Sequence, residues 1–151
     1  MALGEAAGTA ARLAIDEDGW LHTGDMGTMD YDGTIYIKGR NKNMLLGPSG
    51  QNIYPEEIEN KLNNMPFVME SLVLQNAENK LVALVVPDYD AMDEAKLTTK
   101  DLEMVMDENR KALNSTTAAY ESITKIQIYP SEFEKTPKKS IKRFLYVNQL
   151  K

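Results

Sequence analysis

The sequence contains no cysteine and only one histidine among its 151 residues. Without cysteine the chain has no disulfide, no thiolate nucleophile and no cysteine-based metal site. With His22 as the sole histidine, a histidine-cluster metal site and a pair of catalytic imidazoles are also excluded. We therefore predict no resident metal, and the lack of cysteine fits a reducing compartment, so we expect a cytoplasmic protein.

Long hydrophobic runs and a net positive charge are missing as well. No apolar stretch approaches the roughly 20 residues that a membrane-spanning helix needs. The start, MALGEAAGTAARLAIDEDGW, lacks the basic end and apolar core of a signal peptide. The formal net charge is −6, whereas nucleic acids and anionic membranes need a basic face. We predict no transmembrane segment and no nucleic-acid partner.

The hydrophobic content of 42% is enough for the core of one ordinary domain. The small, Ala/Gly-rich start predicts a disordered lead-in over residues 1–17. The stretch Met29 to Arg40 predicts a β-hairpin with Asp32-Gly33 as a two-residue turn. An irregular loop is expected around residues 47–50, because glycine, proline and serine follow one another there.

Downstream, helical and strand patterns alternate. Pro55 opens a helix that we expect to end near Asn63. Thr98 or Thr99 is expected to cap a second helix. The apolar and β-branched stretches at residues 68–74, 81–86 and 125–129 predict three strands. In the second helix one apolar stripe is formed by Leu102, Val105, Met106 and Leu113. This order predicts an α+β fold, a small three-stranded sheet with packed helices, preceded by the hairpin.

Three places upstream of the first helix carry polar groups suited to a nucleotide. In GWLHTGDMG, Asp25 can accept two hydroxyl hydrogen bonds from a ribose, or it can cap its own turn. Arg40, at the end of the hairpin, can reach a sugar or a phosphate, or it can be a solvated surface residue. The backbone N–H groups at Ser49-Gly50-Gln51 can bind an anion, although the P-loop pattern is absent.

A basic stretch, EKTPKKSIKR (residues 134–143), stands out near the C-terminus of an acidic chain. It holds four lysines and an arginine within ten residues. One of these lysines can serve as a catalytic cation for a phosphate, or the stretch can be a solvated basic segment.

Taken in order and spacing, GWLHTGDMG, YIKGRNKNMLLGPSGQNIYPEEIE and the KT…IKR segment resemble the C-terminal part of the AMP-forming acyl-CoA synthetases. This family belongs to the adenylate-forming superfamily, with luciferases and peptide-synthetase adenylation domains. The resemblance runs from about Asp18 to the end. It implies that a carboxylic acid reacts with ATP to give an acyl-adenylate and pyrophosphate, and that coenzyme A then displaces AMP.

The resemblance also assigns roles to single residues. Asp25 corresponds to the ribose-binding Asp of the family, and Arg40 to the Arg of its nucleotide-contacting Gly-Arg pair. Asn43 lies at the hinge, where the family usually carries Asp or Lys, and asparagine tolerates the required backbone change.

Two further sites follow from the same resemblance. Ser49, Gly50 and Gln51 lie on the loop that faces the pantetheine of coenzyme A, although GPSGQN is longer by one residue than the commoner form. The family's Lys-Thr-x-Ser-Gly-Lys-Ile-x-Arg segment places Ser140 where its second lysine stabilises the α-phosphate. Either Lys139 or Lys142 substitutes as the catalytic cation, or the enzyme adenylates without it.

The domain organisation implied is the end of a large adenylation domain at residues 18–42, including the hairpin, and a mobile C-terminal α+β domain at residues 43–151. The partners implied are the large N-terminal domain of the same chain and a fatty or other carboxylic acid. ATP with Mg²⁺ and coenzyme A are substrates of the full-length enzyme, and this fragment is expected to bind none tightly and to be inactive alone.

The PEEIE run and the divergent lysine segment favour a long-chain fatty-acid ligase. The alternative is a non-catalytic module of the same fold that docks on a carrier or partner protein.

Overall fold

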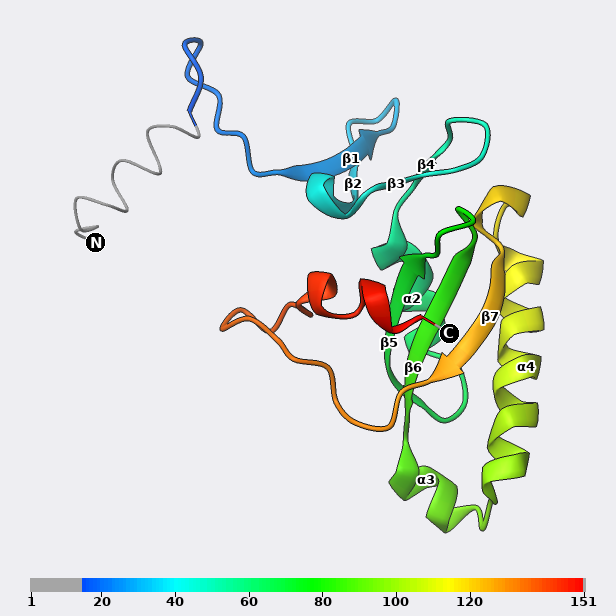
Figure 1. The fold of residues 1–151 in the computed structure, drawn as a ribbon. Coiled ribbons are helices and arrows are strands. Elements are labelled where there is room, and N and C mark those ends of the chain that lie inside the picture. Colours follow the sequence, from blue (N-terminus) through cyan, green and yellow to red (C-terminus); the bar gives the residue numbers. More distant parts are fainter. Residues whose placement is uncertain (1–14, 151) are drawn as a thin grey trace. The chain divides into compact units, whose positions relative to one another are not determined.

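The structure is a computed structural model that describes residues 15–150 (Figure 1). The chain divides into two compact units, the first ending at Lys42 and the second beginning at Asn43.

The first unit contains the expected hairpin, built from β1 (Asp25–Met29) and β2 (Ile35–Arg40), which pair antiparallel. The prediction of its turn was wrong. Asp30 N–H donates to Thr34 O at 2.9 Å, and Gly33 N–H donates to Asp30 O at 3.0 Å. Gly33 has φ +86°. The connection is therefore a three-residue loop whose last residue is left-handed, not a two-residue Asp-Gly turn.

The lead-in expected over residues 1–17 lies mostly outside the described residues. Its last three residues belong to a small closed turn, in which Ile15 bridges to Leu21. Asp16 N–H donates to Trp20 O at 2.9 Å, and Gly19, at φ +87°, is the left-handed residue.

The second unit begins with a two-stranded ribbon and continues into a mixed domain (Figure 1). Its helices and strands are β3 (Leu45–Leu46), β4 (Asn52–Ile53), α2 (Pro55–Asn63), β5 (Val68–Gln75), β6 (Leu81–Pro87), α3 (Tyr89–Glu94), α4 (Thr99–Thr116) and β7 (Ile123–Ile128). Single turns of 3₁₀ helix are η1 (Asn41–Asn43), which spans the boundary between the units, and η2 (Ala119–Glu121), η3 (Arg143–Leu145) and η4 (Val147–Gln149) in the second unit.

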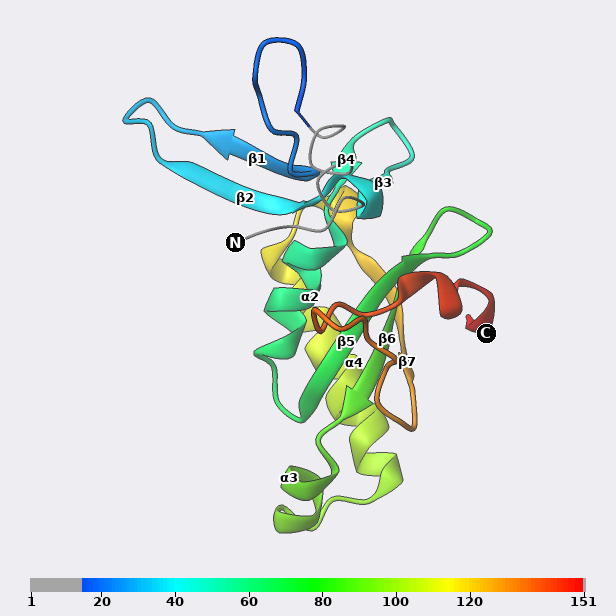
Figure 2. The same ribbon diagram turned by 90° about the vertical axis from the view of Figure 1, so that its left-hand side faces the viewer.

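The sheet has the order β5-β6-β7, with β6 antiparallel to β5 and parallel to β7. Helices α2 and α4 cover one face, and the chain after β7 covers the other (Figure 2). Side chains along β6 alternate between the two layers, with Ala83 and Val85 on the helix side and Leu84 and Val86 on the opposite side. Both faces of β6 are therefore buried, which explains its uninterrupted apolar sequence.

Local signals account for the two long helices. Pro55 stands at the start of α2, and the side chain of Thr98 accepts from Asp101 N–H in a capping box at the start of α4. Leu102, Met106 and Leu113 are buried as expected. Asn109 lies in the same stripe, and its amide donates to Pro66 O at 2.9 Å.

The segment after β7 folds back onto the sheet through three aromatic rings. Tyr129, Phe133 and Tyr146 have ring centroids 5.0–5.4 Å apart. Phe133 and Tyr146 are buried against Leu72 and Leu84. Stacked and edge-on aromatic pairs bury large areas with defined geometry. They fix the path of the chain on both sides of residues 134–143, and the predicted fold class is confirmed.

Candidate functional site

In the first unit, the hairpin register brings Asp25 and Arg40 together as directly opposite residues. Arg40 Nη1 lies 2.6 Å from Asp25 Oδ1 and donates to Thr23 O at 3.0 Å. The side chains stay 52% exposed for Arg40 and 33% exposed for Asp25. A carboxylate and a guanidinium held side by side in solvent reach can bind hydroxyl groups and phosphate.

Gly24 explains how the guanidinium fits there. A β-carbon at this position would lie 3.1 Å from Arg40 Nη2, and the residue has φ +79°. A side chain would meet both a strained backbone and the guanidinium, so glycine is needed for the pair to form.

Asn43 opens the second unit and ends η1. Its amide donates to Glu56 Oε1 at 2.7 Å, in the first turn of α2. The side chain therefore ties this residue to the domain that follows it.

The loop between β3 and β4 is a closed turn. Gly47 N–H donates to Gln51 O at 2.8 Å, and Gly50, at φ +80°, donates to Gly47 O at 3.0 Å. Gln51 Oε1 accepts from Ser49 N–H at 3.1 Å. The backbone N–H groups proposed to bind an anion at Ser49 and Gly50 are thus already bonded within the turn. Of the three residues predicted here, Ser49 and Gly50 lie exposed at the tip, and Gln51 folds inward.

Residues 134–143 form a hairpin, which we call the basic hairpin. Lys135 bridges to Ile141, and Lys142 N–H donates to Glu134 O at 2.9 Å. Thr136 N–H donates to Ser140 O, and Lys139 N–H to Thr136 O, both at 2.8 Å. Lys139 thus lies at the tip and has φ +63°.

This five-residue turn recurs along the described chain, and the pattern sets Lys139 apart. The same pair of backbone hydrogen bonds closes turns whose left-handed residue is Gly19, Gly33, Gly50 or Asn79. Glycine and asparagine tolerate this conformation, whereas other residues are strained in it. Of these five left-handed residues, Lys139 is the one whose residue type does not favour this conformation.

The lysines of the basic hairpin differ in their partners. Lys135 forms an ion pair with Glu70, and Lys142 Nζ lies 2.6 Å from Glu134 Oε1. The side chains of Lys138 and Lys139 make no hydrogen bond or ion pair within residues 15–150, and both are exposed, as is Ser140. The unengaged cation nearest Ser140 is therefore Lys139.

A buried ion pair at the base of this hairpin was missed by sequence reasoning. Arg143 Nη1 and Nη2 each lie 2.6 Å from an oxygen of Glu59, which is 6% exposed. Burial raises the pKa of the Glu59 carboxyl, and the Arg143 guanidinium and the Val73 N–H partly counter this rise. The usable signal was the place of Glu59 on the buried side of α2, beside Ile58 and Leu62. A charge in an apolar stripe indicates a buried partner.

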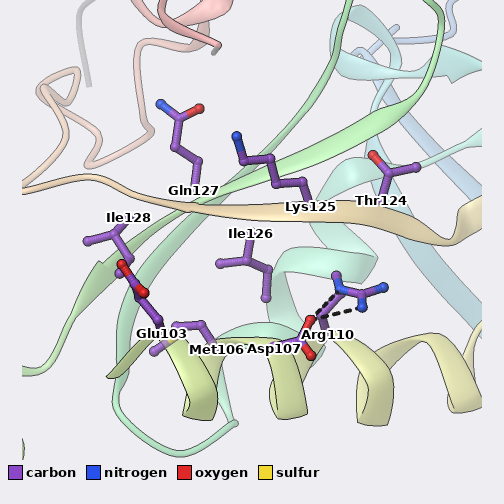
Figure 3. Close-up of a pocket in the computed structure, with 9 residues that line it drawn as sticks. All are labelled: Glu103, Met106, Asp107, Arg110, Thr124, Lys125, Ile126, Gln127 and Ile128. Atoms are coloured by element: carbon purple, nitrogen blue, oxygen red, sulfur yellow. Dashed lines mark hydrogen bonds and ion pairs between the residues drawn. The ribbon is translucent and has the colours of Figure 1, made fainter. Parts of the chain in front are cut away.

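A separate groove of about 480 Å³ lies between α4 and β7 (Figure 3). Arg110 and Asp107 form an ion pair of 2.9 Å on its helix side. None of the residues predicted from sequence to form a site lines this groove. No helix in the described part of the chain is long and apolar enough to cross a membrane.

These features define a class, an α+β domain with a three-stranded sheet that follows a β-hairpin. The adenylation domain of a carboxylate reductase from Mycobacterium chelonae has this fold, with a TM-score of 0.79 over 97% of this chain and 24% of that one, at 20% identity. Residues 43–151 match the family described as the AMP-binding enzyme C-terminal domain. The chain belongs to this family, and the resemblance seen in the sequence is confirmed.

Two curated relatives show the range of the family. The long-chain-fatty-acid–CoA ligase FadD15 of Mycobacterium tuberculosis is 31% identical over 145 residues, covering 83% of this chain and 24% of the relative. The indoleacetate–CoA ligase of Aromatoleum aromaticum is 42% identical over 81 residues, covering 51% and 16%. The chain thus spans a quarter or less of the length of these relatives.

Proposed function

We propose that this chain is the C-terminal portion of an AMP-forming acid–thiol ligase. The full-length enzyme would convert a carboxylic acid and ATP, entering as its magnesium complex, into an acyl-adenylate and pyrophosphate. Coenzyme A would then displace AMP to form the thioester. A large N-terminal adenylation domain of the same chain would hold the acyl pocket. The observation that carries the proposal is the exposed Asp25–Arg40 pair, located just before a domain that belongs to this family.

In this proposal Asp25 binds the ribose hydroxyls and Arg40 the nucleotide. The 2.6 Å contact between them orients the carboxylate toward one face, and their exposure leaves both within reach of a ligand. Asn43 is the hinge of the mobile domain of residues 43–151. Ser49 and Gly50 face the pantetheine, and Gln51 shapes the turn that presents them.

For the adenylation step we propose Lys139 as the catalytic cation in place of the neutral Ser140. Lys142 is the weaker candidate, because Glu134 already neutralises its ammonium at 2.6 Å. A charge aimed at the developing negative charge on the phosphate lowers the barrier most when no other anion competes for it.

A long-chain fatty acid is the acyl substrate we propose, supported by the FadD15 match over most of this chain. The indoleacetate–CoA ligase match makes an arylacetic acid the main competitor. A cytoplasmic location would suit both, since ATP and coenzyme A are available there.

The test uses the full-length polypeptide and measures acid-dependent exchange of pyrophosphate into ATP. Fatty acids of short, medium and long chain and an arylacetic acid are compared. Asp25→Asn and Arg40→Ala should each slow exchange about 10- to 100-fold, the size of a lost charge-assisted hydrogen bond. Lys80→Ala, which removes an exposed lysine outside the proposed sites, should leave it unchanged. Exchange with none of the acids would instead favour a non-catalytic docking module, and full activity of Arg40→Ala would remove the assignment of the nucleotide site.

A further inference from the structure

The ion pair between Glu59 and Arg143 joins two segments that are 84 residues apart in sequence. Arg143 Nη1 donates to Glu59 Oε1 and Arg143 Nη2 donates to Glu59 Oε2, each at 2.6 Å. The side chains are 9% exposed for Glu59 and 18% exposed for Arg143. A bidentate geometry fixes direction as well as distance, so the pair defines where the chain at Arg143 lies on the domain.

The pair also completes the outer edge of the sheet. β5 is an edge strand, and its residue Val73 donates its N–H to Glu59 Oε1 at 2.9 Å. Val73 O accepts from Arg143 Nη1 at 3.5 Å. Two side chains thus satisfy the backbone groups that a further strand would otherwise pair. Arg143 is therefore attached directly to the edge strand of the sheet.

The basic hairpin leaves the domain from this attachment. Other contacts also hold its base, among them the Lys135–Glu70 ion pair, the Glu134 N–H, which donates to Tyr146 Oη at 2.6 Å, and Ile141, which packs against the buried cluster of Phe133 and Tyr146. Beyond them, within residues 15–150, the hydrogen bonds of the tip stay inside its own turn, including the one from Ser140 N–H to Thr136 Oγ1 at 3.3 Å. The place of Lys139 in space is therefore set at the base, not at the tip.

Stability alone is a poor explanation of such a pair. Desolvation of two charges offsets much of their attraction, and apolar residues of similar size often replace a buried ion pair without loss of stability. What apolar residues cannot replace is the direction that the guanidinium fork imposes. The geometry thus points to a role in placing the hairpin.

We propose that Glu59 and Arg143 are positioning residues for the adenylation step, which hold the basic hairpin so that Lys139 reaches the reacting phosphate. This inference rests on the proposed function. Neither residue touches the substrate in it. A displacement of about 1 Å of a catalytic group can cost about 100-fold in rate. A loosened base of the hairpin would therefore displace Lys139 and slow adenylation.

The test compares Arg143→Lys and Arg143→Met in the full-length protein. Arg143→Lys keeps the charge but loses the fork, and it carries the test if Arg143→Met fails to fold. Pyrophosphate exchange should fall about 10-fold in Arg143→Lys and further in Arg143→Met, in kcat and with little change in KM. Thioester formation from supplied acyl-adenylate should stay within about 2-fold of wild type. Arg110→Met, which breaks an exposed arginine pair outside the hairpin, is the matched control and should change neither rate.

A second readout does not depend on activity. Amide hydrogen exchange at Thr136, Lys139 and Ser140 should accelerate in Arg143→Lys, while the amides of β6 stay protected. If wild type shows no adenylation, the proposed function fails. The amide hydrogen exchange data still decide whether the Glu59–Arg143 pair anchors the basic hairpin. The positioning role would be overturned by unchanged amide hydrogen exchange in the basic hairpin of Arg143→Lys. It would also be overturned if the rates of both half-reactions fell in parallel with the loss of folded protein.

Discussion

Lys139 occupies a backbone conformation that costs a residue with a β-carbon about 1 kcal/mol or more. Four other turns of the same geometry use glycine or asparagine at this point. Strained residues persist where the strained geometry serves a purpose, and they cluster at functional sites. Phe67 and Lys96 also have positive φ outside the proposed sites, so the case for Lys139 rests on its exposed ammonium at the tip and not on strain alone.

Lys139→Gly should raise the free energy of unfolding of residues 43–151 by about 1 kcal/mol, because glycine adopts this φ without strain. Chemical denaturation monitored by circular dichroism measures the change. Asn79→Gly is the matched control and should gain less, since asparagine tolerates the left-handed region. A destabilised Lys139→Gly would show that the lysine is held by contacts that outweigh its strain.

Glu59 gives a prediction in pH. In Arg143→Met the buried carboxylate loses its cation, so its pKa in the folded state should rise further above the value in the unfolded chain. The folded state then binds the proton more tightly, and stability is lost as pH rises through the folded pKa. The deficit of Arg143→Met against wild type in the free energy of unfolding should grow as the pH rises above the ordinary pKa of a glutamate carboxyl, toward about 3–5 kcal/mol. The double variant with Glu59→Gln should show no such growth, and a pH-independent deficit in Arg143→Met would contradict this account.

Among the elements, the long helix α4 and the central strand β6 could be predicted from the sequence, whereas the short helix α3 and the turn of the first hairpin could not. β6 was recognised because burial on both faces leaves an unbroken apolar run. Helix α3 was missed, since six residues with one buried side chain carry no readable period. The hairpin turn was misread because Asp-Gly suits a two-residue turn, while here the glycine fills the last position of a longer one.

For the candidate site, the sequence pointed to Asp25 and Arg40, and the strand register explains why they meet. It could not reveal the partner of Arg143. A contact between residues 84 positions apart depends on how α2 and the C-terminal segment pack on β5, and no local pattern encodes it. Nor could the sequence reveal that Lys142 pairs with Glu134, the contact for which our proposal favours Lys139 over Lys142.

The N-cap of helix α4 gives a prediction for the stability of the domain. The sequence left Thr98 and Thr99 open, and the structure selects Thr98, whose hydroxyl accepts from Asp101 N–H at 3.2 Å. Thr98→Ala should lower the free energy of unfolding by about 1 kcal/mol. Thr99→Ala should stay within about 0.5 kcal/mol of wild type. Equal effects of the two changes would contradict the capping assignment.

At the scale of the whole molecule, the chain consists of a hairpin unit and a mixed domain that divide at Lys42 and Asn43. The family match begins at the same residue. This division lies at Asn43, the residue that we propose as the hinge.

Asn43→Pro in the full-length enzyme should slow complete thioester turnover several-fold, because proline fixes φ and limits the backbone change at the hinge. Each half-reaction assayed alone should be affected less. Asn43→Ala removes only the hydrogen bond to Glu56 and separates the side chain from the backbone effect. Normal turnover of Asn43→Pro would count against the hinge.

The most direct measurement is pyrophosphate exchange by the full-length enzyme, comparing wild type with Lys139→Ala, Lys142→Ala and the pair Lys139→Gly/Ser140→Lys. Loss of the cation in Lys139→Ala should slow adenylation at least about 10-fold while thioester formation from supplied acyl-adenylate survives. Lys142→Ala should remain near wild type. Lys139→Gly/Ser140→Lys should recover the rate, because it restores a lysine one position later on an unstrained turn. Unimpaired exchange by Lys139→Ala would contradict the account and leave the chemistry of the first step to the large domain.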